Sequence, residues 1–156
     1  MFAYFGAGCF WGVESEFRKL NGVISTSVGY MGGNTNNPTY EKVCTDLTGH
    51  AEVVQVEYDD QSISFNKLLE IFMNIHDPSQ LNRQGPDIGS QYRSVIFYVN
   101  EDQKSLSLQK ISEMNKEIDI NVVTNVEPQA EYFMGEEYHQ KYLEKRGLAS
   151  CHINLT

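Results

Sequence analysis

The chain has 156 residues, of which 40% are hydrophobic and 21% charged, and its formal net charge is −9. This length suits a single domain that buries its own core without disulfides or a structural metal, so we expect one domain over 1–156. The acidic charge argues against binding of nucleic acid, whose phosphates require Lys and Arg clusters. The sequence has no long apolar run and no leader-like start, which argues against a membrane span and favours a cytoplasmic location.

Strand and helix patterns alternate along the chain. Strand composition predicts strands at 2–5, 23–30, 51–58, 94–99 and 121–126, and helical spacing of apolar residues predicts helices at 10–20, 65–75, 101–119 and 136–145. Two long segments rich in Gly, Asn and Pro, 31–50 and 76–91, are expected to be loops that carry function. The pattern therefore predicts an α/β or α+β fold with a mixed sheet and packed helices.

Cys9 is the most informative residue. The glycine-rich turn expected at 6–8 precedes it, and a helix is expected to follow, so its thiol falls at the first turn of that helix. Unpaired backbone N–H groups and the helix dipole stabilise a thiolate there, and the thiolate is the nucleophilic form of cysteine. Phe10 and Trp11 could form an apolar pocket beside the sulfur. A small buried cysteine among core aromatics is the alternative.

One acidic and two phenolic positions could assist a thiolate. Glu52 begins an otherwise apolar strand, where burial could raise its pKa and let it donate a proton near neutrality; a solvated carboxylate is the alternative. Tyr40 and Tyr92 are loop phenols, which are good hydrogen-bond donors to an oxygen that gains negative charge, although packing alone would also explain them. Asp87 is by default a turn residue.

The remaining cysteines and two histidines allow weaker inferences. Cys44 is expected to be a small buried hydrophobe, and His139 a structural histidine. His50 could be a base for Cys9, but nothing in the sequence brings the two together. Cys151 lies in an expected mobile tail, 148–156, and a mobile thiol combined with a low-pKa thiol is typical of a nucleophile and its resolving partner. The spacing of Cys and His predicts no metal site.

The chain resembles the A-type peptide methionine sulfoxide reductases over essentially its whole length. The resemblance rests on blocks that occur in one order: Gly8-Cys9-Phe10-Trp11-Gly12, Pro38-Thr39-Tyr40, Gly49-His50-Ala51-Glu52, Gln91-Tyr92-Arg93-Ser94 and Glu137-Tyr138-His139-Gln140. It implies a ferredoxin-like two-layer α/β sandwich with a loop-rich active-site side. It also implies reduction of the S epimer of methionine sulfoxide, free or in proteins, to methionine.

The same resemblance implies the catalytic roles. Cys9 matches the family's attacking thiolate, which becomes a sulfenic acid, and Glu52 matches a proton donor to the sulfoxide oxygen. Cys151 matches the recycling cysteine, which would form a disulfide with Cys9. An external dithiol such as thioredoxin would open that disulfide, so the expected partners are a thioredoxin-like reductant and oxidised proteins, with no cofactor or metal.

The resemblance implies further substrate-binding positions, namely Phe10, Trp11, Tyr40, Asp87 and Tyr92. Phe10 and Trp11 would hold the S-methyl group, and Asp87 would be a supporting carboxylate. Tyr40 and Tyr92 would donate hydrogen bonds to the sulfoxide oxygen. Two other functions stay open. One is a thiol peroxidase, which shares the sulfenic acid but needs no methyl pocket, and the other is a non-catalytic binder of oxidised methionine.

Overall fold

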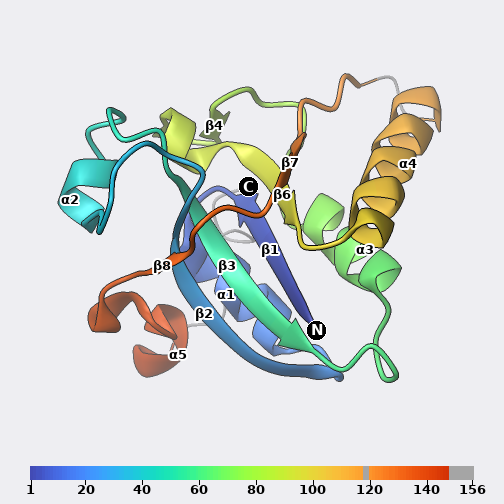
Figure 1. The fold of residues 1–156 in the computed structure, drawn as a ribbon, viewed down its shortest axis with the longest axis horizontal. Coiled ribbons are helices and arrows are strands. Elements are labelled where there is room, and N and C mark those ends of the chain that lie inside the picture. The colour runs from blue at the N-terminus through green and yellow to red at the C-terminus, as the bar shows by residue number, and fades with distance from the viewer. Residues whose placement is uncertain (118–119, 148–156) are drawn as a thin grey trace.

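A computed structural model describes residues 1–117 and 120–147 of the protein, and Figure 1 shows its arrangement around one twisted sheet. The six strands of this sheet lie in the order β7-β6-β1-β3-β2-β8. Their bounds are Phe2–Ala7 for β1, Val23–Met31 for β2, Ala51–Tyr58 for β3, Ser94–Tyr98 for β6, Asn125–Pro128 for β7 and Phe133–Met134 for β8. Neighbouring strands run antiparallel, except that β6 and β7 are parallel. The sheet is therefore mixed, as predicted.

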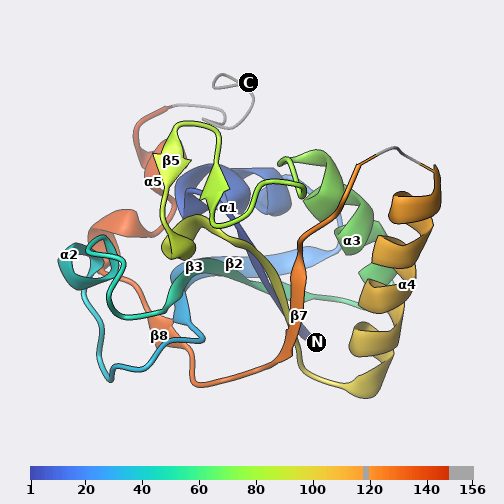
Figure 2. The same ribbon diagram turned by 90° about the horizontal axis from the view of Figure 1, so that it is seen from above.

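Helices α1 and α3 cover one face of the sheet, which is clearest when the molecule is seen from above (Figure 2). The helices are α1 (Phe10–Arg18), α2 (Tyr40–Val43), α3 (Phe65–Asn74), α4 (Glu101–Glu117) and α5 (Tyr142–Lys145), with 3-10 turns η1 (Ser90–Tyr92) and η2 (Glu137–His139). The start of α3 is fixed by Ser64, whose side chain accepts a hydrogen bond from the Lys67 N–H at 3.1 Å. Helix α4 packs against α3, β6 and β7. The α/β class predicted from the sequence is confirmed.

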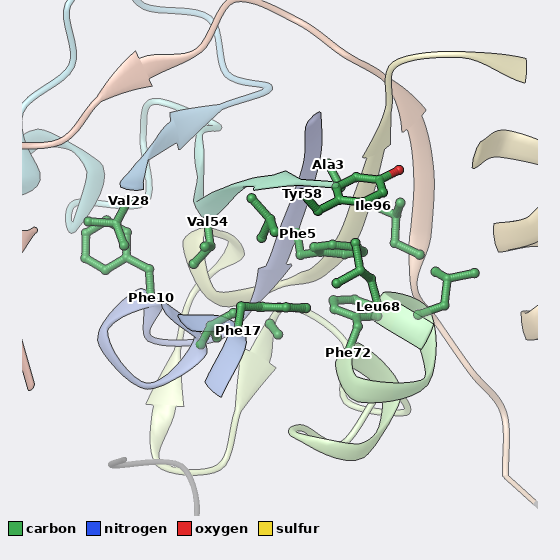
Figure 3. Close-up of a cluster of buried hydrophobic side chains, with 14 of the residues drawn as sticks. Ala3, Phe5, Phe10, Phe17, Val28, Val54, Tyr58, Leu68, Phe72 and Ile96 are labelled. Atoms are coloured by element: carbon green, nitrogen blue, oxygen red, sulfur yellow. The ribbon is translucent and has the colours of Figure 1, made fainter. Parts of the chain in front are cut away.

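The core lies between the sheet and helices α1 and α3, and Figure 3 shows its packed side chains. Phe5 points from β1 toward the helices, and its ring stacks on Phe17 of α1 at a centroid distance of 4.9 Å and contacts Phe72 of α3 at 5.1 Å. Its neighbour Tyr4 points to the other face, where it packs with a second buried cluster. Burial of each such aromatic side chain contributes about 2 kcal/mol, so this layer fixes α1 firmly on the sheet.

Three chain segments meet at one end of the sheet because β1 is antiparallel to both of its neighbours. Ala7 at the end of β1 pairs with Ser94 at the start of β6, and Phe5 pairs with Val54 near the start of β3. The residues after β1 therefore lie beside the first residues of β3 and the residues before β6. On the other side of β3, Glu52 pairs with Tyr30 of β2. The irregular segments that contain α2 and the separate hairpin of β4 (Arg83–Gln84) and β5 (Asp87–Ile88) lie at this end (Figure 2).

Some predicted elements differ from the structure. Strand β1 continues through Ala7, so the turn expected at 6–8 is confined to Gly8, whose φ is +95°. The strand predicted at 121–126 begins at Asn125, since the N–H groups of Val122 and Val123 donate to Asn115 and Pro78 instead of to a neighbouring strand. The tail predicted at 148–156 and its Cys151 lie outside the described residues.

The helix predicted over 136–145 is also wrong, because the segment is broken into η2 and α5. Lys141 separates them with a left-handed φ of 54°, and its N–H donates to Glu14 Oε1 at 2.8 Å. Just before it, the side chain of Gln140 pairs with both the N–H and the carbonyl of Val28 on β2. These tertiary hydrogen bonds outweigh the helical propensity of the segment.

Candidate active site

Cys9 lies where β1 passes into α1. The chain turns at Gly8, which has the positive φ that favours glycine, and Cys9 occupies the N-cap position of the nine-residue helix α1. Its carbonyl oxygen accepts the first hydrogen bond of the helix, from the Val13 N–H at 3.5 Å, and its side chain is half-buried. The structure therefore places Cys9 at the start of a helix, as the sequence pattern predicted.

Glu52 is buried at the start of β3, with only 2% of its surface exposed. Its Oε1 accepts a hydrogen bond of 3.2 Å from the backbone N–H of Phe10, the residue after Cys9. Its Oε2 has no hydrogen-bond partner among the described residues. Burial raises the pKa of Glu52 to about 8; the Phe10 hydrogen bond opposes this rise and the charge of Asp87 adds to it. A protonated carboxyl therefore lies beside the thiol at neutral pH, and the solvated alternative is wrong.

Two phenols come to the same place from different loops. Tyr40 is the first residue of α2, and Tyr92 is the last residue of η1. Burial raises the pKa of both phenols above the ordinary value. A hydrogen bond with Cys44 raises the pKa of Tyr40 further, and the charge of Glu52 raises the pKa of both. Both hydroxyls therefore stay protonated and can donate hydrogen bonds.

Asp87 and Cys9 lie close enough to Tyr92 to act on it. After burial and the charge of Glu52, the charges of Asp87 and Cys9 also raise the pKa of the Tyr92 phenol. Asp87 is half-buried on β5 of the small hairpin, and its charge reaches Glu52 as well. The structure thus brings together the thiol, the buried acid, the second carboxylate and a phenol.

Phe10 and Trp11 form an aromatic wall beside the thiol. The Phe10 side chain is buried and packs against Tyr30 at a centroid distance of 5.7 Å. Trp11 is half-buried, and its indole ring stacks face to face on Tyr142 at 3.7 Å. The indole N–H donates a hydrogen bond of 2.9 Å to Nδ1 of His139. Trp11 is therefore held both at its face and at its edge.

The comparisons with known proteins are consistent with this arrangement. Residues 1–156 match the family model described as "Peptide methionine sulfoxide reductase". The chain belongs to this family. Its relative from Acidobacterium capsulatum, a peptide methionine sulfoxide reductase MsrA, is 56% identical over 153 residues, which is 97% of this chain and 98% of the relative. A second MsrA, from Methanothermobacter thermautotrophicus, is 53% identical over 154 residues, which is 97% of this chain and 90% of the relative.

Solved structures of the reductase family share the fold. Reduced Mxr1 from Saccharomyces cerevisiae superposes with a TM-score of 0.89 at 34% identity, covering 94% of this chain and 86% of its own. The order of elements that gathers Cys9, Glu52 and Tyr92 is therefore part of a fold that this family shares.

His139 is a part of the reductase site that the sequence did not reveal. It was expected to be a structural histidine, and it is indeed fully buried, but only one of its ring nitrogens has a partner within the described part of the chain. Nδ1 accepts from Trp11, so the neutral ring carries its proton on Nε2. Burial lowers the pKa of His139, which keeps the ring neutral. The histidine thus fixes the aromatic wall.

Two other expectations are resolved by the geometry. His50 is a loop anchor, because its Nδ1 accepts from the Gly33 N–H at 3.0 Å and its Nε2 donates to the Thr35 carbonyl at 2.8 Å. Neither ring nitrogen is then available as a base for Cys9. Cys44 is exposed, so its assignment as a buried hydrophobe is wrong; Val43 takes the buried position of α2 instead.

Within residues 1–117 and 120–147 of the reductase, no group of three or more His, Cys, Asp or Glu side chains could hold a metal ion. No helix in that part of the chain is long and apolar enough to cross a membrane. The side chains that the structure gathers at the site are a thiol, carboxyl groups and phenols placed against aromatic rings.

Proposed function

We propose that this reductase converts the S epimer of methionine sulfoxide, free or in proteins, to methionine, with Cys9 as the nucleophile and Glu52 as the proton donor. The observation that carries the proposal is the buried, protonated carboxyl of Glu52, whose Oε2 is without a protein partner among the described residues and whose Oε1 bonds to the residue after Cys9. An acid in this state is suited to an oxygen that must be protonated as it leaves sulfur. We propose one reductase domain over 1–156.

The proposed reaction moves one oxygen atom from substrate sulfur to Cys9. The thiolate attacks the sulfoxide sulfur, the electron pair of the sulfur–oxygen bond moves onto oxygen, and Glu52 protonates that oxygen. The attack forms a bond between the Cys9 sulfur and the substrate sulfur. The hydroxyl then leaves the substrate sulfur and bonds to the Cys9 sulfur, while the sulfur–sulfur bond breaks and returns its electron pair to the substrate. Cys9 ends as a sulfenic acid, and the substrate leaves as a thioether. The substrate sulfur gains two electrons, Cys9 loses two, and Glu52 recovers its proton from solvent.

The surrounding residues suit the two halves of the substrate group. The apolar methyl group would lie against Phe10 and Trp11, which exclude water and orient the sulfur. The oxygen would receive hydrogen bonds from Tyr40 and Tyr92, which strengthen as negative charge develops. Asp87 would support this set through its effect on Glu52, since its charge helps keep the acid protonated.

Recycling requires a second thiol and an external reductant. Cys151, which lies outside the described residues, would condense with the sulfenic acid to give a Cys9–Cys151 disulfide and water. A thioredoxin-like dithiol would then reduce that disulfide by exchange, so no prosthetic group takes part. The yeast relative Mxr1 has been crystallised in complex with Trx2, which supports a reductant of this type. We propose the cytoplasm, with its dithiol supply, as the location.

The decisive experiment compares the two epimers of dabsyl-methionine sulfoxide with dithiothreitol as reductant. The proposed function requires turnover of the S epimer only. Equal rates on both epimers would contradict the assignment. Steady consumption of peroxide without any sulfoxide reduction would indicate a thiol peroxidase. Sulfoxide binding that survives alkylation of Cys9, without turnover, would indicate a binding protein.

A further inference from the structure

Glu136 joins two residues of the site and has no part in the chemistry described above. Its Oε1 accepts a hydrogen bond of 2.9 Å from the hydroxyl of Tyr30. Its Oε2 accepts a hydrogen bond of 2.9 Å from the backbone N–H of Tyr40. One carboxylate group, from the segment just before η2, therefore connects β2 to the first residue of α2.

The two residues that Glu136 connects differ in how firmly the fold holds them. Tyr30 is fully buried within β2, pairs with Glu52 across the β2–β3 ladder and packs on Phe10. Tyr40 begins a helix of only four residues, in the long segment between β2 and β3. That segment contains left-handed turns at Gly32, Asn37, Asp46 and Gly49 rather than an extended ladder. Glu136 thus anchors a loop residue to the rigid sheet.

The charge of Glu136 suits this connection. The N–H of Tyr40 belongs to the first turn of α2 and has no acceptor within that helix. Burial raises the pKa of Glu136, but the hydrogen bonds from the Tyr40 N–H and the Tyr30 hydroxyl outweigh it, and the pKa lies below its ordinary value. The group is therefore ionised at neutral pH, and both of its oxygens accept charge-assisted hydrogen bonds.

We infer that Glu136 is a positioning residue for sulfoxide reduction, because it fixes the backbone of Tyr40 against Tyr30 and so places the Tyr40 phenol at the reacting oxygen. The inference rests on the proposed function, in which that phenol donates to the oxygen. The aromatic contacts agree with this placement: the Tyr40 ring lies 4.5 Å from the His139 ring and 6.5 Å from the Phe10 ring. The segment that holds Trp11 through His139 thus also holds Tyr40 through Glu136.

The test is a double-mutant cycle between Glu136 and Tyr40, read as the single-turnover rate of methionine formation from the S sulfoxide. Glu136→Ala should lower this rate roughly tenfold, the scale expected when a reacting group is misplaced by a fraction of an ångström. In a Tyr40→Phe background, which lacks the phenol hydroxyl, Glu136→Ala should change the rate by less than about twofold. Equal losses in both backgrounds would overturn the inference, because they would mean that Glu136 acts on the fold as a whole.

Three further variants distinguish placement of Tyr40 by Glu136 from an effect of the Glu136 charge and from an effect on folding. Glu136→Gln keeps an acceptor for the Tyr40 N–H and should restore the rate to within about threefold of wild type. Glu136→Asp keeps the charge but is too short to reach both donors, so it should be as slow as Glu136→Ala and serves as the test if the alanine variant does not fold. The matched control is Glu137→Ala, at the neighbouring acid whose side chain is 90% exposed, and its rate should not change.

The rates of these variants also distinguish failure of the positioning role of Glu136 from failure of the proposed function. If wild type does not reduce the S sulfoxide at all, the proposed function fails before the cycle begins. If wild type is active and Glu136→Asp keeps the full rate, the positioning inference alone is wrong. A fast Glu136→Asp together with a slow Glu136→Gln would mean that charge, rather than placement of Tyr40, is what the residue supplies.

Discussion

The backbone N–H of Phe10 donates a 3.2 Å hydrogen bond to the Glu52 carboxyl, although 42 positions separate the two residues. The bond exists because the end of β1 lies beside the start of β3, and it places a buried acid next to the residue that follows Cys9. The other carboxyl oxygen, Oε2, has no partner among the residues that the structure describes. One contact therefore both orients the acid and leaves an oxygen for the substrate.

Replacing Glu52 with Gln should slow the sulfoxide step more than it weakens substrate binding. Gln can still accept the Phe10 hydrogen bond, so the fold and the pocket are kept, but it cannot supply a proton. We expect a single-turnover rate reduced by roughly 10²-fold or more, the usual scale for loss of a positioned general acid. Rapid-quench measurement of methionine per enzyme checks this. A normal single-turnover rate in Glu52→Gln would remove Glu52 from the mechanism.

The pH dependence of the same step should report Glu52. Its pKa is raised to about 8, so the acid is protonated and competent below that pH and loses its proton above it. The single-turnover rate should therefore fall above pH 8, tending to about tenfold per pH unit. Because Gln does not ionise, the small residual rate of Glu52→Gln should show no such fall. An alkaline limb of the same midpoint in both proteins would assign the titration to another group.

The ionisation of Glu52 should also make the free energy of unfolding depend on pH. The folded-state pKa of about 8 lies above the ordinary value of 4.5, so the folded protein keeps a proton that the unfolded chain releases. The free energy of unfolding should therefore decrease as pH rises from 4.5 to 8 and level off above that. At pH 7, Glu52→Gln should be more stable than wild type by roughly 3 kcal/mol, and at pH 4 the two should be nearly equal. Urea denaturation at both pH values measures this difference, and parallel pH curves would refute it.

The position of Cys9 could be predicted from the sequence because it depends on a local pattern: a strand, a glycine turn and a helical repeat place Cys9 at a helix start. The burial of Glu52 stayed open in the sequence, because a carboxylate at the start of a strand can also be solvated, and only the packing of β3 between its neighbours decides it. The partners of Glu136 and His139 could not be predicted in this way. The hydrogen bonds of Glu136 to Tyr30 and Tyr40 cross 106 and 96 positions, and that of His139 to Trp11 crosses 128.

The broken helix at 136–145 shows the same limit. Its apolar residues do recur at helical spacing, but the N–H of Lys141 donates to Glu14 and the side-chain amide of Gln140 bonds to Val28. Both partners lie more than 100 positions away, so a prediction from neighbouring residues cannot include them. The exposed Cys44 is a smaller example. Cys44 is the C-cap of the four-residue helix α2, and burial of a residue there depends on what the short helix packs against rather than on hydrophobicity alone.

The two cysteines within the described residues should differ sharply when replaced by serine. Cys9→Ser should abolish reduction, since a hydroxyl at the helix start is not an effective nucleophile toward sulfoxide. Cys44→Ser should stay within a few-fold of wild type, because Cys44 is exposed and a serine hydroxyl can replace its hydrogen bond with Tyr40. Turnover of the S sulfoxide with dithiothreitol gives the comparison. If both variants were equally inactive, the assignment of the nucleophile would be wrong.

Replacing Cys151 with Ser should separate the chemical step from recycling. With no reductant, the variant should form one methionine per enzyme and stop, because the Cys9 sulfenic acid has no thiol to condense with. Wild type should also stop after one, but with both thiols consumed in a Cys9–Cys151 disulfide. The predicted disulfide requires the Cα atoms of Cys9 and Cys151 to come within about 7 Å of each other.

Peptide mapping of the turned-over enzyme decides this last prediction. A proteolytic fragment that joins the Cys9 and Cys151 peptides, and that separates on reduction, should accumulate in wild type and be absent from Cys151→Ser. Cys44→Ser should yield the same fragment as wild type. A bridge between Cys9 and Cys44 would instead make Cys44 the resolving thiol. The lack of any bridge, while thioredoxin still supports turnover, would mean that the reductant attacks the Cys9 sulfenic acid directly.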